Sequence, residues 1–186
     1  IMYPGPDAAY GEGIEALLQE VLYQVLRAMS AQLDSDLVVH SAVETIVRLT
    51  GYPHVCIALP NENGVQWVVR GAAGNLAAEL GATYPIHQGV IVRGFKTGQT
   101  QWVRDILDDP NYVRDVSAAN APALRSELVQ PLRHGDRLLG ALNIESDRAD
   151  AFTDADARMI QSLADMIALA VEKARLYEEA QQEIAE

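Results

Sequence analysis

The chain has 186 residues, of which 49% are hydrophobic and 22% charged, and it carries a formal net charge of −12. The length suits one globular domain with an appended segment, while the negative charge argues against a surface that binds nucleic acid or an anionic membrane. No stretch approaches the ~20 apolar residues of a membrane-spanning helix, and the single cysteine, Cys56, favours a reducing compartment. We therefore expect a cytoplasmic domain that makes no membrane contact.

The N-terminal part predicts a flexible lead-in followed by two helices. Pro and Gly punctuate residues 1–13, and we expect a single domain over residues 14–186. Apolar residues recur at helical spacing from Ile14 onwards. A second helix is expected to begin near Asp34, Ser35 and Asp36, each of which offers an N-capping side chain, and to end at Gly51.

The middle of the chain predicts three strands, one helix and a polar loop. Residues 89–100 are interpreted as a helix because their apolar positions have helical spacing and Gly98 can end it, although Val and Ile equally favour a strand. Residues 107–123 are interpreted as a loop. The expected strands, each rich in β-branched or aromatic residues, are 54–60, 65–73 and 101–106.

Residues 126–146, "SELVQPLRHGDRLLGALNIES", predict a β-hairpin that turns at Gly135 and Asp136. A hairpin with one wet face would alternate strictly between apolar and polar residues. Here apolar residues fall on both faces, so both sides of the sheet must be covered. Helices before, between and after the hairpins then indicate an α+β fold with helices on both faces of the sheet.

The final segment predicts one helix over residues 154–186, which at 1.5 Å per residue is roughly 50 Å long and exceeds the diameter of the domain. Its apolar residues follow a heptad pattern, which predicts a coiled-coil seam in a homodimer. The residues off the seam that are expected to serve the domain core are Met159, Met166, Leu169, Val171 and Leu176. The parallel or antiparallel sense of the dimer stays open. The predicted dimer seam consists of Ile160, Leu163, Ile167, Ala170, Ala174 and Tyr177.

Three motifs follow one another in residues 126–156: Ser-Glu-Leu-x-x-Pro-Leu, Gly-x-Leu-Asn-Ile-Glu-Ser and Phe-Thr-x-x-Asp. Their order resembles the end of a GAF domain of a bacterial signal-transduction protein, such as a sensor histidine kinase or a cyclic-di-GMP enzyme. The resemblance covers residues 17–180. It implies a central antiparallel sheet of five to six strands, with the terminal helix bundle on one face and ligand-pocket helices and loops on the other.

Specialised members of the resembled family can be tested on single residues. Ile144 and Ala157 stand where cyclic-nucleotide-binding members carry Lys and Glu, which argues against such a ligand. No cysteine follows Asp105, so covalent bilin attachment is not expected. The enzymatic branch, free methionine sulfoxide reductase, depends on several pocket cysteines, and Cys56 alone cannot form the required disulfide. His87 is the one candidate for an axial haem ligand, and we expect no haem.

No catalytic or metal-binding arrangement is recognisable in the sequence. The four histidines have no metal-ligand spacing, and there is no nucleophile elbow, phosphate loop or calcium loop. The candidate ligand-binding residues each have core packing or a surface salt bridge as an equal interpretation. They comprise two walls, a roof group and three polar contacts, namely Phe95, Trp102, Tyr112, Asp105, Arg125 and Ser126.

The resemblance implies a non-enzymatic, small-molecule-sensing regulatory domain that signals through its dimeric exit helix to an output domain of a longer protein. The alternative is a ligandless dimerisation spacer whose pocket is filled by its own side chains. The sequence does not identify a ligand or a cofactor.

Overall fold

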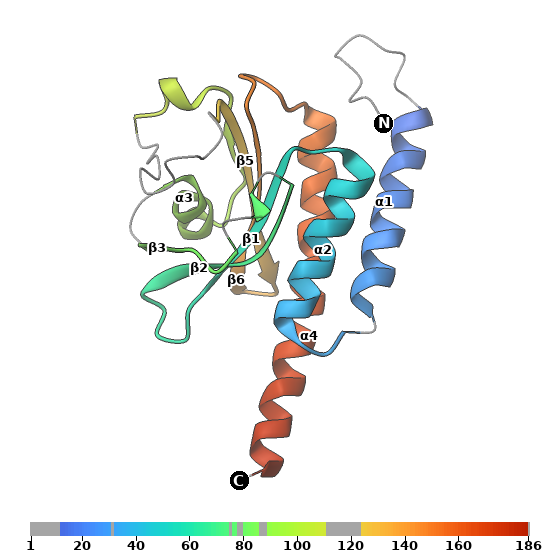
Figure 1. Cartoon of the computed structure of the whole chain (residues 1–186), viewed down its shortest axis with the longest axis vertical. Coiled ribbons are helices and arrows are strands. Elements are labelled where there is room, and N and C mark those ends of the chain that lie inside the picture. The colour runs from blue at the N-terminus through green and yellow to red at the C-terminus, as the bar shows by residue number, and fades with distance from the viewer. Residues whose placement is uncertain are drawn as a thin grey trace.

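The computed structural model consists of one curled antiparallel sheet between two layers of helices (Figure 1). It describes residues 12–30, 32–74, 76–77, 80–85, 89–110 and 124–185. The helices are α1 (Glu12–Ser30), α2 (Ser35–Thr50), α3 (Val90–Thr97) and α4 (Asp154–Ala185), with a short 3-10 turn, η2 (Ile106–Asp108). The strands are β1 (His54–Pro60), β2 (Gln66–Gly74), β3 (Thr83–Pro85), β4 (Gln101–Val103), β5 (Ser126–His134) and β6 (Arg137–Ser146).

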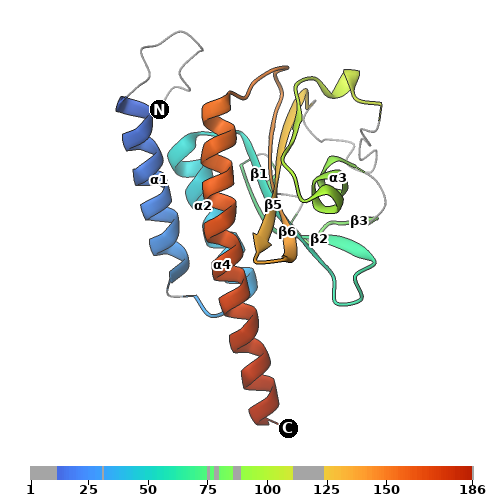
Figure 2. The ribbon, with the colours of Figure 1, turned by 180° about the vertical axis from the view of Figure 1, so that it is seen from behind.

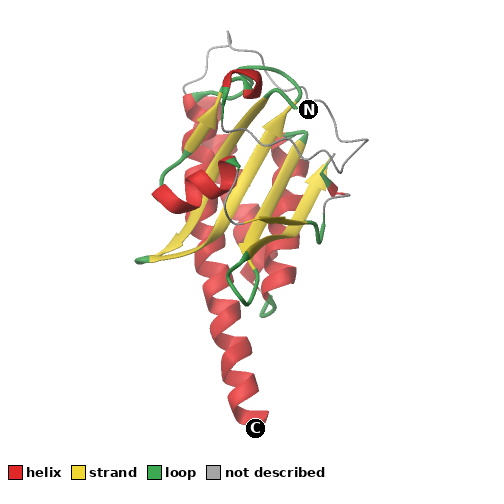
Figure 3. Cartoon of the chain, turned by 90° about the vertical axis from the view of Figure 1, so that its left-hand side faces the viewer, coloured by secondary structure: helices red, strands yellow, loops and turns green. Residues whose placement is uncertain are grey.

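The six strands lie in the order β3-β2-β1-β6-β5-β4, and every neighbouring pair is antiparallel (Figure 3). Helices α1, α2 and α4 cover one face, which we call the bundle face (Figure 2). Helix α3 lies on the opposite face, which we call the α3 face. This arrangement confirms the predicted α+β fold class.

Capping residues set the ends of α2, as the sequence predicts. The Asp34 side chain accepts a hydrogen bond from the backbone N–H of Leu37 at 2.9 Å, and Gly51 ends the helix with φ 73°. Helix α2 lies close against β2. A Cβ atom added at Gly71 would stand only 2.8 Å from the carbonyl oxygen of Val39. A glycine at this position therefore lets the two backbones approach.

The hairpin of β5 and β6 explains the apolar residues on both faces of the sheet. Its turn is the predicted one, with Gly135 at φ 57°. On the bundle face, Leu128 and Leu142 are fully buried in the main core. On the α3 face, Val129 and Ala141 are fully buried in a smaller cluster with residues of α3 and β4.

The structure corrects the predicted dimer seam on α4. Four of its six residues are fully buried in the chain's own core, so they are not available to a second protomer. Those four are Ile160, Leu163, Ile167 and Ala174. Ala170 is half-buried against the same core, and Tyr177 is 44% exposed. The heptad pattern arises because α4 packs along α2 and β5, which needs the same 3–4 spacing as a coiled coil.

Two of the residues on α4 that were expected to serve the core are exposed instead. Leu169 and Leu176 are 58% and 52% exposed, so these two leucines lie on the outer side of α4. Beyond Ala174 none of the described residues of α4 is buried, and the helix projects past the end of the sheet (Figure 1). The great length of the final helix is therefore as predicted. Val171, Met159 and Met166 do serve the core as expected, whereas Leu169 and Leu176 face outward.

The remaining differences are small. Strand β3 was not predicted; it has three residues and pairs with β2 at the sheet edge. The strand predicted over residues 101–106 ends at Val103, and the 3-10 turn η2 begins at Ile106. Among the described residues, no helix has an apolar stretch long enough to cross a bilayer.

Candidate functional site

Three polar residues occupy adjacent positions on the α3 face of β5 and β6. Glu127 lies directly opposite Glu145 in the ladder, and Asn143 lies two residues before Glu145 on the same side of its strand. Apolar residues occupy most of the corresponding positions along these strands. We call Glu127, Asn143 and Glu145 the acidic cluster.

The acidic cluster is unusually buried for its polarity. Glu127 is 5% exposed and Asn143 is 1% exposed. The Asn143 amide donates a hydrogen bond from Nδ2 to Oε1 of Glu145 at 2.7 Å. The other amide atom, Oδ1, is buried and accepts no hydrogen bond from the described part of the chain. Because a buried polar group without a partner costs free energy, this acceptor indicates a site that is completed by a donor.

Electrostatics set the charge of the cluster. Burial raises the pKa of Glu127 well above its ordinary value, and the neighbouring Glu145 carboxyl raises it further. The Asn143 amide and Arg93 act in the opposite direction, and Asp109 partly cancels Arg93. Two carboxyl groups on one buried face favour a shared proton or a bound cation over two bare charges.

The nearby arginine is held by other partners. Arg93 on α3 pairs with Asp109, with Nη2 and Oδ2 at 2.7 Å, and its Nε donates to Oε1 of Gln101 at 2.8 Å. Its guanidinium is therefore engaged at the margin of the cluster. Within the described residues, no Lys or Arg forms an ion pair with Glu127.

Of the predicted ligand-binding residues, Phe95 lies on the expected face. Its ring packs edge-on against Trp67, with the ring centroids 4.6 Å apart. Trp67 is 1% exposed, and its Nε1 donates no hydrogen bond within the described residues. Phe95 thus belongs to an aromatic wall on the α3 face, beside the half-buried Tyr84.

Two other predicted contacts are corrected, because alternate residues of a strand point to opposite faces. Trp102 lies opposite Leu128 and packs against the bundle-face core, so it is no wall of a site on the α3 face. Ser126 has the same parity as Leu128, and its hydroxyl donates to the carbonyl oxygen of Arg148 at 2.7 Å. The Ser126 side chain therefore secures the loop after β6.

The predicted polar contacts Asp105 and Arg125 lie together as an ion pair. Arg125 Nε donates to Oδ1 of Asp105 at 3.1 Å, and its Nη2 contacts Oδ2. The Arg125 guanidinium holds the pKa of Asp105 below its ordinary value. This pair joins the end of β4 to the start of β5, which fits the structural interpretation of both residues. Tyr112, and also His87, lie outside the described residues.

The sequence contains one signal for the acidic cluster that the prediction did not use. Glu127 stands beside Leu128, and Asn143 and Glu145 stand on either side of Ile144, in segments predicted to be strands. Burial of a carboxyl group at such a position costs free energy, and a protein that accepts this cost commonly uses the group in a functional site. Without the strand register, the sequence does not show which face of the sheet each side chain occupies. The pairing of Glu127 with Glu145 could therefore not be predicted.

A metal site and a surface hollow were the other candidates for a functional site. The described residues contain no group of three His, Cys, Asp or Glu side chains placed to hold a metal ion. An open hollow of about 220 Å³ lies between the α2–β1 turn and the loop after β6. Its aromatic residues, Tyr52 and Phe152, pack edge-on with centroids 6.1 Å apart, and the Tyr52 hydroxyl donates to Asp156. This hollow belongs to the packing that starts α4.

The six-stranded antiparallel sheet, with the helix bundle on one face and α3 on the other, defines an α+β domain with helices on both faces of one sheet. The model of the GAF domain family matches residues 11–172. The chain belongs to the GAF domain family.

Solved structures share this fold at low sequence identity. A free methionine-R-sulfoxide reductase from Neisseria meningitidis, solved with its substrate, is 24% identical, with a TM-score of 0.75 over 94% of this chain and 99% of that chain. The GAF domain of a phosphoenolpyruvate-protein phosphotransferase from Coxiella burnetii is 15% identical, with a TM-score of 0.78 over 87% of this chain and 96% of that chain. A methyl-accepting chemotaxis protein is 22% identical, with a TM-score of 0.71 over 82% and 98% of the respective chains. A comparison with curated proteins finds no match.

Proposed function

We propose that this chain is a small-molecule-sensing regulatory domain whose ligand carries a positively charged amino group bound by the acidic cluster. GAF domains commonly serve as sensory or regulatory modules of signalling proteins, as the chemotaxis and phosphotransferase relatives illustrate. The main support is the buried pair of Glu127 and Asn143, whose oxygen atoms can accept more hydrogen bonds than the described residues around them donate. An ammonium group supplies three N–H donors and one positive charge, and both suit this surplus of acceptors.

The aromatic wall supports a ligand with an apolar part. Phe95 and Trp67 lie on the same face as the acidic cluster but further along the sheet, since Trp67 pairs with Pro60 at one end of β1 and Glu145 with His54 at the other. Ligand sites typically combine such apolar walls with a few polar groups that fix orientation. We infer that the ligand is an amino acid or a related amine, held at its ammonium group by Glu127.

We further propose that the domain is not an enzyme. Free methionine-R-sulfoxide reductases occur among the structural relatives at low identity. Cys56 is the single cysteine of this sequence and is 3% exposed in an apolar cluster, which suits a packing role. A dithiol mechanism needs a second thiol, and the chain has none to offer.

The proposed output route is the projecting end of α4 in a homodimer, leading to an output domain of a longer cytoplasmic protein such as a two-component receptor. The surface proposed for the dimer replaces the predicted seam with the exposed apolar residues of the two long outer helices. These residues are Leu17, Tyr23 and Leu26 on α1 and Leu169, Leu176, Tyr177 and Ile184 on α4. An interface on this surface leaves the core of each protomer intact.

Native mass spectrometry followed by a thermal-shift screen tests the proposal. The probes are the free amino acids and simple diamines, each paired with an analogue in which a hydroxyl group replaces the amino group. We expect at least one amine, and not its hydroxyl analogue, to raise the melting temperature of the wild-type chain. Glu127→Gln should abolish that rise, and the matched control Glu62→Gln in the exposed β1–β2 turn should keep it.

Two outcomes would contradict the proposal. A bare dimer that responds to none of the probes would favour the alternative, a ligandless spacer. A ligand that binds equally well to the Glu127→Gln variant would show that sensing does not use the acidic cluster.

A further inference from the structure

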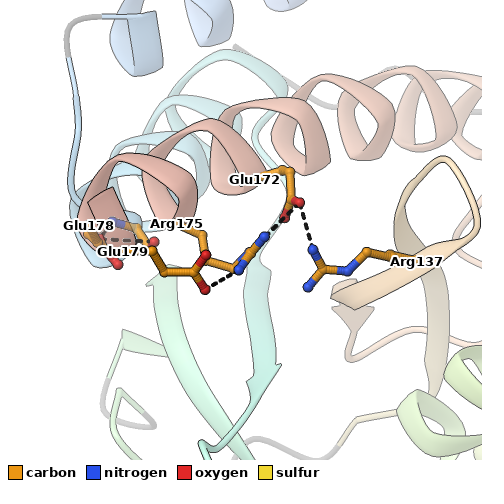
Figure 4. A network of polar contacts seen from close by, with 6 residues as sticks. Arg137, Glu172, Arg175, Glu178 and Glu179 are labelled. Carbon is orange, nitrogen blue, oxygen red and sulfur yellow. Dashed lines mark hydrogen bonds and ion pairs between the residues drawn. The ribbon is translucent and has the colours of Figure 1, made fainter. Parts of the chain in front are cut away.

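The exit of α4 from the domain is held by polar contacts with three other elements. Glu172, one turn before the helix leaves the core, accepts hydrogen bonds from Arg137 and Arg175 (Figure 4). Glu178 accepts from the backbone N–H and the hydroxyl of Ser35 at 2.7 and 3.1 Å. Lys173 Nζ reaches the carbonyl oxygen of Ser30 at 3.4 Å. The contacts thus come from the start of β6, the start of α2 and the end of α1.

These contacts divide into two kinds. The partners of Glu178 and Lys173 belong to α2 and α1, so these contacts hold α4 within the bundle. Arg175 lies three residues after Glu172 on the same helix and moves with it. Arg137 belongs to the β5–β6 hairpin, and its Nη1 lies 2.7 Å from Oε1 of Glu172. Among the ion pairs formed by the described residues of α4, this one joins the helix to the sheet.

The burial of Glu172 gives this pair its strength. The side chain of Glu172 is 9% exposed, whereas that of Arg137 is 56% exposed. A buried carboxylate depends strongly on its partners, because water replaces a lost donor poorly there. The hydrogen bonds from Arg175 hold the pKa of Glu172 below its ordinary value against the effect of burial, and the charge of Arg137 adds to this. Glu172 is therefore a charged anchor at physiological pH.

The hairpin that carries Arg137 also carries the acidic cluster. Eight residues separate Arg137 from Glu145 on β6, which is about 26 Å at 3.3 Å per residue. The ladder shifts register between Leu132 and Arg133, next to the turn, and such a bulge bends and twists the strand locally. One continuous strand pair thus links the ligand-binding face to the exit of α4.

We propose that Arg137 and Glu172 form a latch that sets the position of the projecting end of α4 relative to the β5–β6 hairpin. The role of the latch in signalling rests on the proposed function, and its effect on helix position does not. Ligand binding between the two glutamates changes the hairpin, and the latch passes that change to α4. Without the latch, the buried part of α4 remains packed on α2 and β5, and the projecting end loses its ion pair with the hairpin.

Distance measurement by pulsed electron paramagnetic resonance on the ligand-free chain tests the latch. Spin labels are attached at Glu62→Cys in the β1–β2 turn and Glu183→Cys in the projecting end, both exposed positions, with Cys56→Ala as background. An excess of unlabelled chain confines the signal to distances within one protomer. Arg137→Gln is compared with Arg133→Gln, a matched change in the same hairpin at an arginine that forms no ion pair with the described residues.

We expect one narrow distance distribution for the parent and for Arg133→Gln, and loss of that single peak in Arg137→Gln. Arg137→Lys keeps the charge and should retain most of the narrow peak. Circular dichroism must show that all variants stay folded at the temperature of measurement. An unchanged distribution in folded Arg137→Gln would overturn the latch and leave the ligand proposal standing. Conversely, a broadened distribution in a chain that binds no amine would uphold the latch and remove the proposed ligand.

Discussion

Substitution of Leu163 by Ala tests whether the heptad residues of α4 serve the core or a dimer. Leu163 is fully buried within its own chain, whereas Leu176, on the same helix, is 52% exposed. Both leucines lose the same atoms on change to Ala and gain the same helix propensity, so burial is the variable that differs. The pair is therefore a matched comparison.

The expected sizes follow from burial. Removal of a fully buried leucine side chain costs about 3 kcal/mol of unfolding free energy, which in a chain of this length lowers the melting temperature by ~9 °C. The exposed Leu176 should change stability by less than about 0.5 kcal/mol. Leu176→Ala should instead weaken self-association, since Leu176 lies on the surface proposed for the dimer.

Thermal unfolding by circular dichroism, at several protein concentrations, measures the first effect, and sedimentation velocity measures the second. The concentration series separates core stability from stability gained through association. If Leu163→Ala kept the parent melting temperature while it dissociated the dimer, Leu163 would lie in a seam between protomers. The assignment of the heptad residues to the core would then be wrong.

Three further substitutions have defined outcomes. Because burial raises the pKa of Glu127 in the folded chain, its contribution favours folding at acid pH and is lost as pH rises from the ordinary value of 4.5 through the raised pKa; Glu127→Gln should therefore flatten the decline of melting temperature over that range. Gly74→Ala should cost about 2 kcal/mol or more in urea unfolding, because φ is +70° and the new Cβ would stand 2.3 Å from a backbone carbonyl oxygen. The control Gly64→Ala, at φ +65° with open space around it, should cost less. Asp156→Ala should cost about 2 kcal/mol in the same assay, because its carboxylate accepts from the N–H and hydroxyl of Thr153 and caps α4; an unchanged unfolding midpoint would show that the cap contributes nothing.

The parts of the fold that could be predicted from sequence are those with local causes. Asp34 and Gly51 bound α2 because a capping side chain and a left-handed glycine act within one turn. Gly135 placed the hairpin turn for the same reason. The missed strand β3 has only three residues, which is too short to show a period.

The parts that could not be predicted depend on which face a residue occupies. Phe95 and Trp102 were both expected to be walls of one site, and the register of β4 on β5 sends Trp102 to the other face. The heptad pattern of α4 has the same ambiguity, because a helix that packs on its own sheet and a helix in a coiled coil bury the same spacing. Sequence period identifies a buried stripe and leaves its partner unspecified.

The pairing of Glu127 with Glu145 bears directly on how a ligand could act on this fold. Burial and the neighbouring Glu145 carboxyl both oppose ionisation of Glu127 and raise its pKa, so a negative charge on Glu127 carries a local cost in the ligand-free β5–β6 pair. Under the proposed function, a bound ammonium group would remove that cost at the hairpin. Differential stabilisation of one element is what a population shift requires. Because Arg137 at the other end of the same hairpin contacts Glu172, the element most affected by the ligand is also the one in contact with the exit of α4.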